Sequence, residues 1–235
     1  MEGKAPPTIL WDFDGTLVAG PGWAKTMVRV LDANYPGHSI TAEQIRAFLQ
    51  EGFPWHNPER YHPELGNPTA WWSFVEAILT RAYQGVGYGR SESKKLAQSA
   101  HQLMLDPDGY STFEDTLPVL QRLSDMGWRH IVLSNHFHEL TDLLDKLPMK
   151  HFIHKCISSA ITGYEKPNPK AFTLALELAG HPEQVWMIGD NPSADVRGAE
   201  AAGIPAILAR HSPNETVKYY ARDLLEAASI IENSL

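Results

Sequence analysis

The sequence predicts an α/β fold: a parallel sheet covered by helices on both faces, with a helical segment inserted after the first strand. Two observations predict this class. Short apolar runs alternate with amphipathic segments over most of the chain. Runs of four apolar residues are too short for helices and are typical of strands buried on both faces. Residues 17–106 break the alternation, because they contain amphipathic stretches and no convincing buried strand.

Four apolar runs are the expected strands, and they comprise residues 8–11, 130–133, 185–188 and 205–208. Amphipathic stretches follow or separate them and are expected to cover the sheet, namely residues 115–126, 169–179 and 193–202. A glycine directly follows each of these stretches, which is a typical end of a helix. Strand and helix therefore alternate, as in parallel sheets.

Residues 17–106 are expected to form a separate helical domain, whereas residues 1–16 and 107–235 form the sheet domain. The amphipathic stretches of the insertion are residues 22–34, 41–50, 69–84 and 91–105. Loops that contain proline and glycine separate them. The chain length of 235 residues suits one large core that carries such an insertion.

Composition and charge exclude several classes of protein. Apolar residues make up 43% of the chain, which excludes a disordered protein. The net charge of −8, without a basic cluster, argues against nucleic acid as a partner. No run approaches the ~18 apolar residues of a membrane span. Because the chain has a single cysteine, Cys156, and no apolar stretch typical of a signal peptide at its start, we expect a soluble cytoplasmic protein.

Reactive polar side chains follow three of the expected strands. Asp12 and Asp14 follow the first, Ser134 the second and Asp190 the third. In open parallel sheets, ligands bind outside the carboxyl ends of the strands. Carboxylates there would bind a hard cation such as Mg²⁺, whereas a hydroxyl and the amine of Lys166 would hold the oxygens of a phosphoryl group.

Four short motifs around these residues resemble, in order, those of the haloacid dehalogenase superfamily, whose members are mostly phosphatases. They are Asp-Phe-Asp-Gly-Thr-Leu at 12–17, Leu-Ser-Asn at 133–135, Gly-Tyr-Glu-Lys-Pro at 163–167 and Gly-Asp-Asn-Pro-Ser-Ala-Asp at 189–195. Each motif is weak alone, but four in this order are specific. The resemblance covers residues 8–17 and 113–210, and it implies a Rossmann-like core with an inserted α-helical cap domain.

The resemblance implies a Mg²⁺-dependent phosphohydrolase that acts on a small phosphorylated metabolite. Asp12 would attack phosphorus and form an aspartyl-phosphate. Asp14 would protonate the leaving oxygen and then activate the hydrolytic water. Asp190, one carboxylate oxygen of Asp12 and the main-chain carbonyl of Asp14 would hold Mg²⁺. An acid at position 14 favours phosphate esters over carbon–halogen bonds, because halide leaves without a proton.

Four further residues receive supporting roles from the same resemblance. Ser134 and Lys166 would bind the phosphoryl oxygens, with Asn135 supporting them. Asp195 would orient the metal ligands or Lys166. These roles agree with electrostatics, because an anionic nucleophile can approach a phosphate dianion only when cations reduce the repulsion.

The insertion offers weaker candidates, which would contact the leaving group. Trp55 and His56 lie in an expected loop, where functional residues are common, and Trp23 and Lys25 lie near the start of the insertion. Tryptophans 71–72 lie in a helical stretch and are expected to belong to the core.

Two other functions stay open from the sequence. A phosphomutase would use the same aspartyl-phosphate and return the group to the substrate, and a catalytically inactive scaffold would only bind. The intact set of motif residues argues against the scaffold. The histidines and the cysteine between residues 136 and 156 match no closed zinc pattern, so no zinc site is predicted. The sequence does not assign an oligomeric state or a particular substrate.

Overall fold

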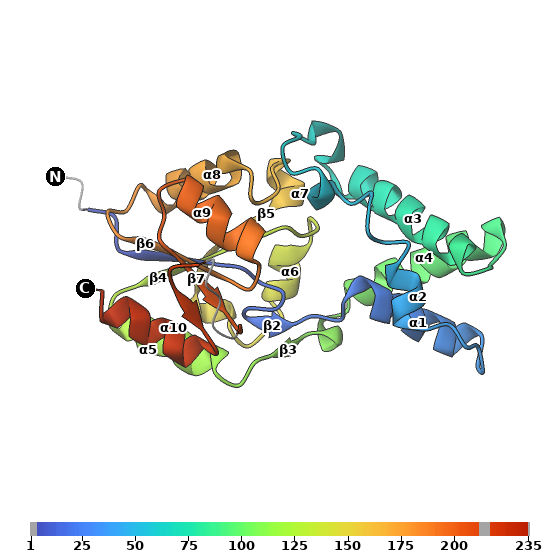
Figure 1. Cartoon of the computed structure of the whole chain (residues 1–235), viewed down its shortest axis with the longest axis horizontal. Coiled ribbons are helices and arrows are strands. Elements are labelled where there is room, and N and C mark those ends of the chain that lie inside the picture. Colours follow the sequence, from blue (N-terminus) through green and yellow to red (C-terminus); the bar gives the residue numbers. More distant parts are fainter. Residues whose placement is uncertain (1–3, 212–216, 235) are drawn as a thin grey trace.

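The computed structural model describes residues 4–211 and 217–234. It contains a six-stranded sheet with helices on both faces, and a group of helices that extends away from one end of the sheet (Figure 1). The strands of the sheet are β1 (Thr8–Trp11), β4 (Arg129–Ser134), β5 (Ile153–Ser158), β6 (Val185–Gly189), β7 (Ala206–Ala209) and β8 (Tyr220–Ala221). The predicted α/β class and all four expected strands are confirmed.

The strand order places β1 in the middle of the sheet. The order is β5-β4-β1-β6-β7-β8, and every neighbouring pair is parallel. From β1 the chain builds β4 and β5 on one side and then returns to build β6, β7 and β8 on the other. The carboxyl ends of β1, β4 and β6 therefore lie side by side where the order reverses, which is the preferred ligand site of such sheets.

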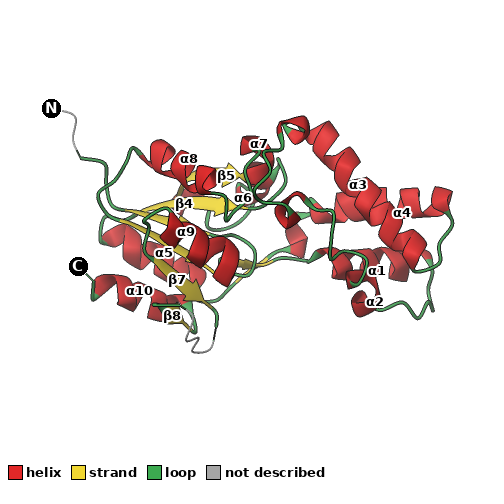
Figure 2. Ribbon diagram, turned by 45° about the horizontal axis from the view of Figure 1, so that its top comes forward, coloured by secondary structure: helices red, strands yellow, loops and turns green. Residues whose placement is uncertain are grey.

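Helices cover both faces of the sheet, as predicted (Figures 1 and 2). One face carries α5 (Thr116–Asp125) and α10 (Leu224–Glu232), and the other carries α8 (Pro169–Ala179) and α9 (Gly198–Ala201). Successive side chains of a strand point to opposite faces. Accordingly, Ile9 and Trp11 belong to one apolar cluster, whereas Leu10 belongs to the other.

The chain between residues 19 and 111 forms a group of four packed helices, here called the inserted helices. They are α1 (Trp23–Asn34), α2 (Ala42–Arg46), α3 (Pro68–Gly85) and α4 (Arg90–Met104). The short strands β2 (Val18–Ala19) and β3 (Ser111–Thr112), which the sequence did not predict, pair where the chain enters and leaves this group. None of the helices within the described residues is long and apolar enough to cross a membrane.

Two expected helices differ in detail. The helix expected at 41–50 ends at Arg46, and turns follow it. The helix expected at 193–202 begins with a π-helical segment, Pro192–Arg197, before α9. The carbonyl of Asn191 accepts from the N–H groups of both Asp195 (3.0 Å) and Val196 (3.3 Å), which widens this turn. Such π turns are frequent at functional sites.

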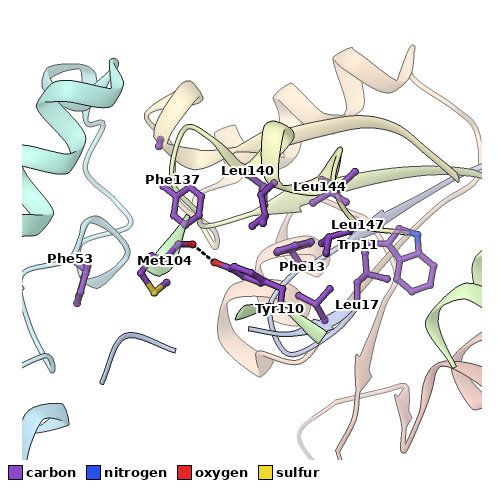
Figure 3. Close-up of a cluster of buried hydrophobic side chains, with 14 of the residues drawn as sticks. Trp11, Phe13, Leu17, Phe53, Met104, Tyr110, Phe137, Leu140, Leu144 and Leu147 are labelled. Atoms are coloured by element: carbon purple, nitrogen blue, oxygen red, sulfur yellow. Dashed lines mark hydrogen bonds between the residues drawn. The ribbon is translucent and has the colours of Figure 1, made fainter. Parts of the chain in front are cut away.

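An apolar cluster connects the sheet with the inserted helices (Figure 3). Phe13, directly after the first aspartate, has its ring centroid 5.9 Å from that of Tyr110. The hydroxyl of Tyr110 donates to the carbonyl of Met104 at the end of α4, at 2.9 Å. The segment after β1 is therefore packed against the return connection from the inserted helices.

Candidate active site

The seven motif residues line one cavity of about 200 Å³ at the carboxyl ends of β1, β4 and β6. They are Asp12, Asp14, Ser134, Asn135, Lys166, Asp190 and Asp195. One residue of the insertion, Trp55, lines the same cavity. The fold thus brings together groups that are up to 183 positions apart in the chain.

Asp12 is buried and held from two directions. Its main-chain N–H donates to the carbonyl of Ile188 in β6, at 2.9 Å. Its carboxylate oxygen Oδ1 accepts from the hydroxyl of Ser134 at 3.1 Å and from the ammonium of Lys166 at 2.8 Å. The carboxylate is therefore fixed beside a hydroxyl and a cation at the edge of the sheet.

Lys166 lies between two carboxylates and is almost fully enclosed. Its Nζ is 2.5 Å from Oδ1 of Asp195 as well as 2.8 Å from Asp12. Asn135 clamps its main chain, because the amide of Asn135 donates to the Lys166 carbonyl (2.9 Å) and accepts from its N–H (2.7 Å). Burial alone would lower the pKa of Lys166, but the charges of Asp12 and Asp195 outweigh it and raise that pKa, so the side chain stays cationic.

Asp190 follows β6 and faces the same cavity. Burial, followed by the negative charge of Asp12, raises the pKa of Asp190 to about 6. Gly15 makes this close approach possible, because its φ is +82° and a Cβ at this position would collide with the Asp190 carboxylate. His211 Nε2 donates to the main-chain carbonyl of Asp190 at 2.8 Å.

The carboxylates suit a hard divalent cation. Oxygens of Asp12, Asp190 and Asp195 lie within 4.8 Å of one another. Asp195 is already engaged on both oxygens, since Oδ1 accepts from Lys166 and Oδ2 from the N–H of Asn191 at 3.0 Å. Asp12 and Asp190 therefore fit a cation better than Asp195, whose carboxylate is fixed between Lys166 and Asn191. Crowded carboxylates with one ammonium fit the charge and oxygen preference of Mg²⁺.

Asp14 lines the same cavity, and its side chain is 44% exposed. Its Oδ2 is 3.3 Å from Nε2 of His136, a side chain that is almost completely buried. The sequence indicated His136 only as part of a set of residues that match no zinc pattern, and it did not reveal this contact. The signal available was its position, two residues after Ser134.

The four candidate residues of the insertion line different cavities. Trp23 and Lys25 line a second cavity of about 270 Å³. Trp55 lines both this cavity and the cavity of the motif residues. Arg46, which the sequence did not single out, lines this second cavity too. His56 lines neither of these two cavities and contributes to a third one.

The loop between α2 and α3 contacts the loop that carries Lys166. The rings of Tyr61 and Tyr164 stack with their centroids 4.6 Å apart. The N–H of His62 donates to the carbonyl of Gly163 at 3.0 Å. These contacts place the loop of the insertion directly against the motif of residues 163–167 that contains Lys166.

Comparisons with known proteins agree with this arrangement. A family model described as haloacid dehalogenase-like hydrolase matches residues 6–203. The glyceraldehyde 3-phosphate phosphatase of Methanopyrus kandleri is 35% identical over 100 residues, which cover 42% of this chain and 43% of that protein. The phosphoglycolate phosphatase of Pseudomonas syringae pv. tomato is 26% identical over 216 residues, covering 91% of this chain and 73% of that protein. The chain spans about half the length of the first curated relatives that it matches.

Solved structures share the fold over nearly the whole chain. The HAD-hydrolase YfnB from Bacillus subtilis, in a crystal form bound to magnesium, aligns with a TM-score of 0.75 and 20% identity. The alignment covers 97% of this chain and 100% of that one. At this identity the likeness concerns the fold alone.

Proposed function

Because the chain belongs to the haloacid dehalogenase-like hydrolase family, we propose that it is a Mg²⁺-dependent phosphohydrolase. Its substrate would be a small phosphate monoester, cleaved through an aspartyl-phosphate on Asp12. The observation that carries the proposal is the convergence of all seven motif residues on one cavity. Relatives named as phosphatases of small phosphorylated compounds support the same reaction class.

In the first half of the proposed reaction, a carboxylate oxygen of Asp12 attacks phosphorus. The bond between phosphorus and the leaving oxygen breaks, and Asp14 gives its proton to that oxygen. The products of this step are the free alcohol and a phosphorylated Asp12. The partly exposed side chain of Asp14 in the cavity suits this exchange with the leaving group.

In the second half, Asp14 takes a proton from a water molecule that attacks the phosphorus of the aspartyl-phosphate. The bond to Asp12 breaks, inorganic phosphate leaves and the protonated Asp14 is ready for the next substrate. Transfer to a second alcohol in place of water would instead identify a phosphomutase.

Charge neutralisation is the main task of the surrounding groups. The ammonium of Lys166 and the hydroxyl of Ser134 both donate to the Asp12 carboxylate. A phosphoryl group that Asp12 attacks would therefore lie within reach of both donors. Asp12, Asp190 and the main-chain carbonyl of Asp14 would hold Mg²⁺. The ion would offset the negative charge of the phosphoryl group and of the crowded carboxylates.

We further propose that residues 17–106 are a cap domain on a core of residues 1–16 and 107–235. Trp55 lines the catalytic cavity, which supports a role of the insertion in contacting the leaving group. The stacking of Tyr61 on Tyr164 supports a docked position of its loop over the core. The chemistry would then belong to the core and the choice of substrate to the cap.

A screen of phosphorylated metabolites with Mg²⁺, read as phosphate release, tests the proposal. We expect release from at least one class of monoester, and none with the Asp12→Asn variant or after chelation of the metal. Release that is undiminished in Asp12→Asn would contradict the mechanism.

A further inference from the structure

We propose that the 270 Å³ cavity beside the active site binds the leaving group and selects a flat ring that bears an acidic substituent. The inference rests on the proposed phosphohydrolase function, because it names the substrate class of that site. The cavity is lined by side chains of the inserted helices and of the segments that connect them.

The second cavity begins where the leaving group would emerge. Trp55 lines both cavities. Gly20 lines the second one, and a Cβ at Gly20 would collide with Oδ1 of Asp14. The second cavity therefore reaches the residue that would protonate the leaving oxygen, and a group attached to that oxygen would lie next to it.

The walls are flat and apolar. The rings of Phe53 and Trp55 stack with centroids 4.4 Å apart and an interplanar angle of 9°. The ring of Trp23 lies 6.5 Å from that of Trp55, tilted by 30°. Trp23 and Trp55 are only half-buried, so part of their surface is open to a ligand. Rigid aromatic walls of this kind favour a planar apolar group.

The rim of the second cavity is cationic, although the chain as a whole is acidic. Lys25 and Arg46 line it, and no carboxylate of the described residues does. One nitrogen of Arg46 binds Glu43 at 2.5 Å, and a guanidinium has further N–H donors to offer. An ammonium and a guanidinium at the rim favour a ligand with a carboxylate or another acidic group.

The test compares kcat/KM for methyl, benzyl, 4-carboxybenzyl and 4-(aminomethyl)benzyl phosphate. The methylene next to oxygen insulates it from the ring substituent, so the three benzyl alcohols have similar leaving ability. We expect kcat/KM to be about tenfold higher for benzyl phosphate than for methyl phosphate. It should also be about tenfold higher for 4-carboxybenzyl phosphate than for 4-(aminomethyl)benzyl phosphate.

Two variants separate the ring from the charge. Trp55→Leu should lower kcat/KM for benzyl phosphate toward the value for methyl phosphate. Lys25→Glu should lower the ratio of kcat/KM for the 4-carboxybenzyl ester to that for the 4-(aminomethyl)benzyl ester to one or below. Lys95→Glu makes the same charge change at an exposed lysine of α4 and should keep the wild-type ratio.

Equal kcat/KM for all four compounds would overturn the inference and leave the phosphohydrolase function standing. Release from none of them would instead argue against that function. Tryptophan fluorescence then decides the inference separately, through the binding of 4-carboxybenzylphosphonate and methylphosphonate. Tighter binding of the former supports the cavity as a binding site, and equal affinity overturns it.

His136 provides an independent observation at the active site, and we infer that it is a positioning residue for Asp14. Its Nε2 lies 3.3 Å from Oδ2 of Asp14. Its ring is enclosed by the rings of Phe13, with centroids 5.5 Å apart, and Phe137, at 4.0 Å. The N–H of Nε2 thus comes from a ring that cannot turn away.

The main chain of His136 is fixed as well. Its N–H donates to the hydroxyl of Ser159 at 3.1 Å, and its carbonyl accepts from the hydroxyl of Ser158 at 2.6 Å. Nδ1 is buried and has no hydrogen-bond partner within residues 4–211 and 217–234. Burial of an imidazole costs free energy unless it is hydrogen-bonded. The carboxylate of Asp14 is therefore the hydrogen-bond partner of this ring, and the ring fixes the direction of that carboxylate.

The expected signature is a selective loss for poor leaving groups. His136→Phe removes the donor and keeps a ring, so kcat/KM should fall about tenfold more for benzyl phosphate than for 4-nitrophenyl phosphate, whose leaving group needs no proton. His136→Gln keeps an N–H donor and should restore part of the loss. His154→Gln, at an exposed position of β5, should change neither value.

An equal loss on both substrates, or a Gln variant no better than the Phe variant, would overturn the positioning role. Thermal melts check that the variants fold. If His136→Phe does not fold, His136→Leu replaces it as the apolar variant in the same comparison.

Discussion

The sheet region and the inserted helices hold their site residues in different ways. In the sheet region, polar groups fix one another: Lys166 contacts Asp12 and Asp195, and Asn135 clamps the main chain of Lys166. At the inserted helices, Trp23 and Trp55 are held by aromatic packing. Charged hydrogen bonds fix atoms to a narrow geometry, whereas aromatic packing defines a shape. The first suits a reaction common to all substrates, and the second suits selection among them.

The largest expected effect falls on the sheet region. Asp12→Asn keeps the shape of the side chain and removes the nucleophile, so hydrolysis of every ester should fall by roughly 10⁴-fold or more. Steady-state phosphate release from 4-nitrophenyl phosphate with Mg²⁺ measures this. A variant with wild-type turnover would place the chemistry elsewhere.

Asp14→Asn should have the second-largest effect on activity, and the size of the loss should depend on the leaving group of the substrate. We expect a loss of about 10²- to 10⁴-fold for alkyl phosphates, because their alkoxides need a proton. Aryl phosphates should lose less in kcat/KM. If both classes lose equally, Asp14 acts on the metal or on the water and not on the leaving oxygen.

Lys166→Met should damage all phosphate esters alike, by about 10²- to 10³-fold, since all share the group that Lys166 neutralises. It should also lower the melting temperature, because Asp12 and Asp195 lose their buried counter-charge. Kinetics on one alkyl and one aryl ester check the first point, and thermal melts check the second. A loss confined to one ester would assign Lys166 to the leaving group.

Trp55→Ala tests the other side of the comparison. A substrate that fills the second cavity should lose roughly 5- to 150-fold in kcat/KM, equivalent to about 1–3 kcal/mol. Methyl phosphate should lose far less, because its leaving group is too small to reach Trp55. If the variant melts early, Trp55 is chiefly a core residue. An equal loss in kcat/KM on both substrates would contradict the proposal that the inserted helices select substrates while the sheet region carries the chemistry.

The smallest expected effect concerns stability and lies in the sheet region, outside the inserted helices. His130 in β4 is buried, with Trp11 Nε1 donating to its Nδ1 at 3.0 Å, and burial lowers its pKa to about 4. The unfolded chain binds a proton near pH 6.5 and the folded one does not, so stability falls between pH 6.5 and 4. At pH 5 the loss is about 2 kcal/mol. Other groups, such as Asp190 with its raised pKa, titrate over the same interval in both proteins. Urea unfolding at pH 7 and pH 5 should therefore show a change in the free energy of unfolding that is about 2 kcal/mol less favourable in the wild type than in His130→Gln.

Local patterns predicted most of the sheet region. The strand of residues 8–11 and the helix of residues 169–179 are set by short-range signals, and so are the motif residues that follow the strands. The pairing of β2 with β3 joins residues more than 90 positions apart, which no local pattern encodes. The contact of His136 with Asp14 is equally long-range. The sequence shows that these residues are present but does not show that they contact one another in the fold.

The inserted helices were harder to interpret because tryptophan serves both packing and binding. The tryptophans of residues 71–72 are buried, as the helical spacing predicted. Trp55 and His56 are neighbours in sequence, yet of the two only Trp55 lines the cavity of the motif residues. Which side of a loop faces the site depends on how the helices pack, and the sequence does not reveal this.

Rapid acid quenching during turnover, followed by peptide mass spectrometry, tests most directly whether the sheet region carries the chemistry. With benzyl phosphate and Mg²⁺, we expect a phosphoryl group on Asp12 to appear before the steady state and to disappear as substrate is consumed. The same label should be absent from Asp12→Asn and from protein without the metal. Phosphate release at the full rate with Asp12 never phosphorylated would contradict the covalent mechanism.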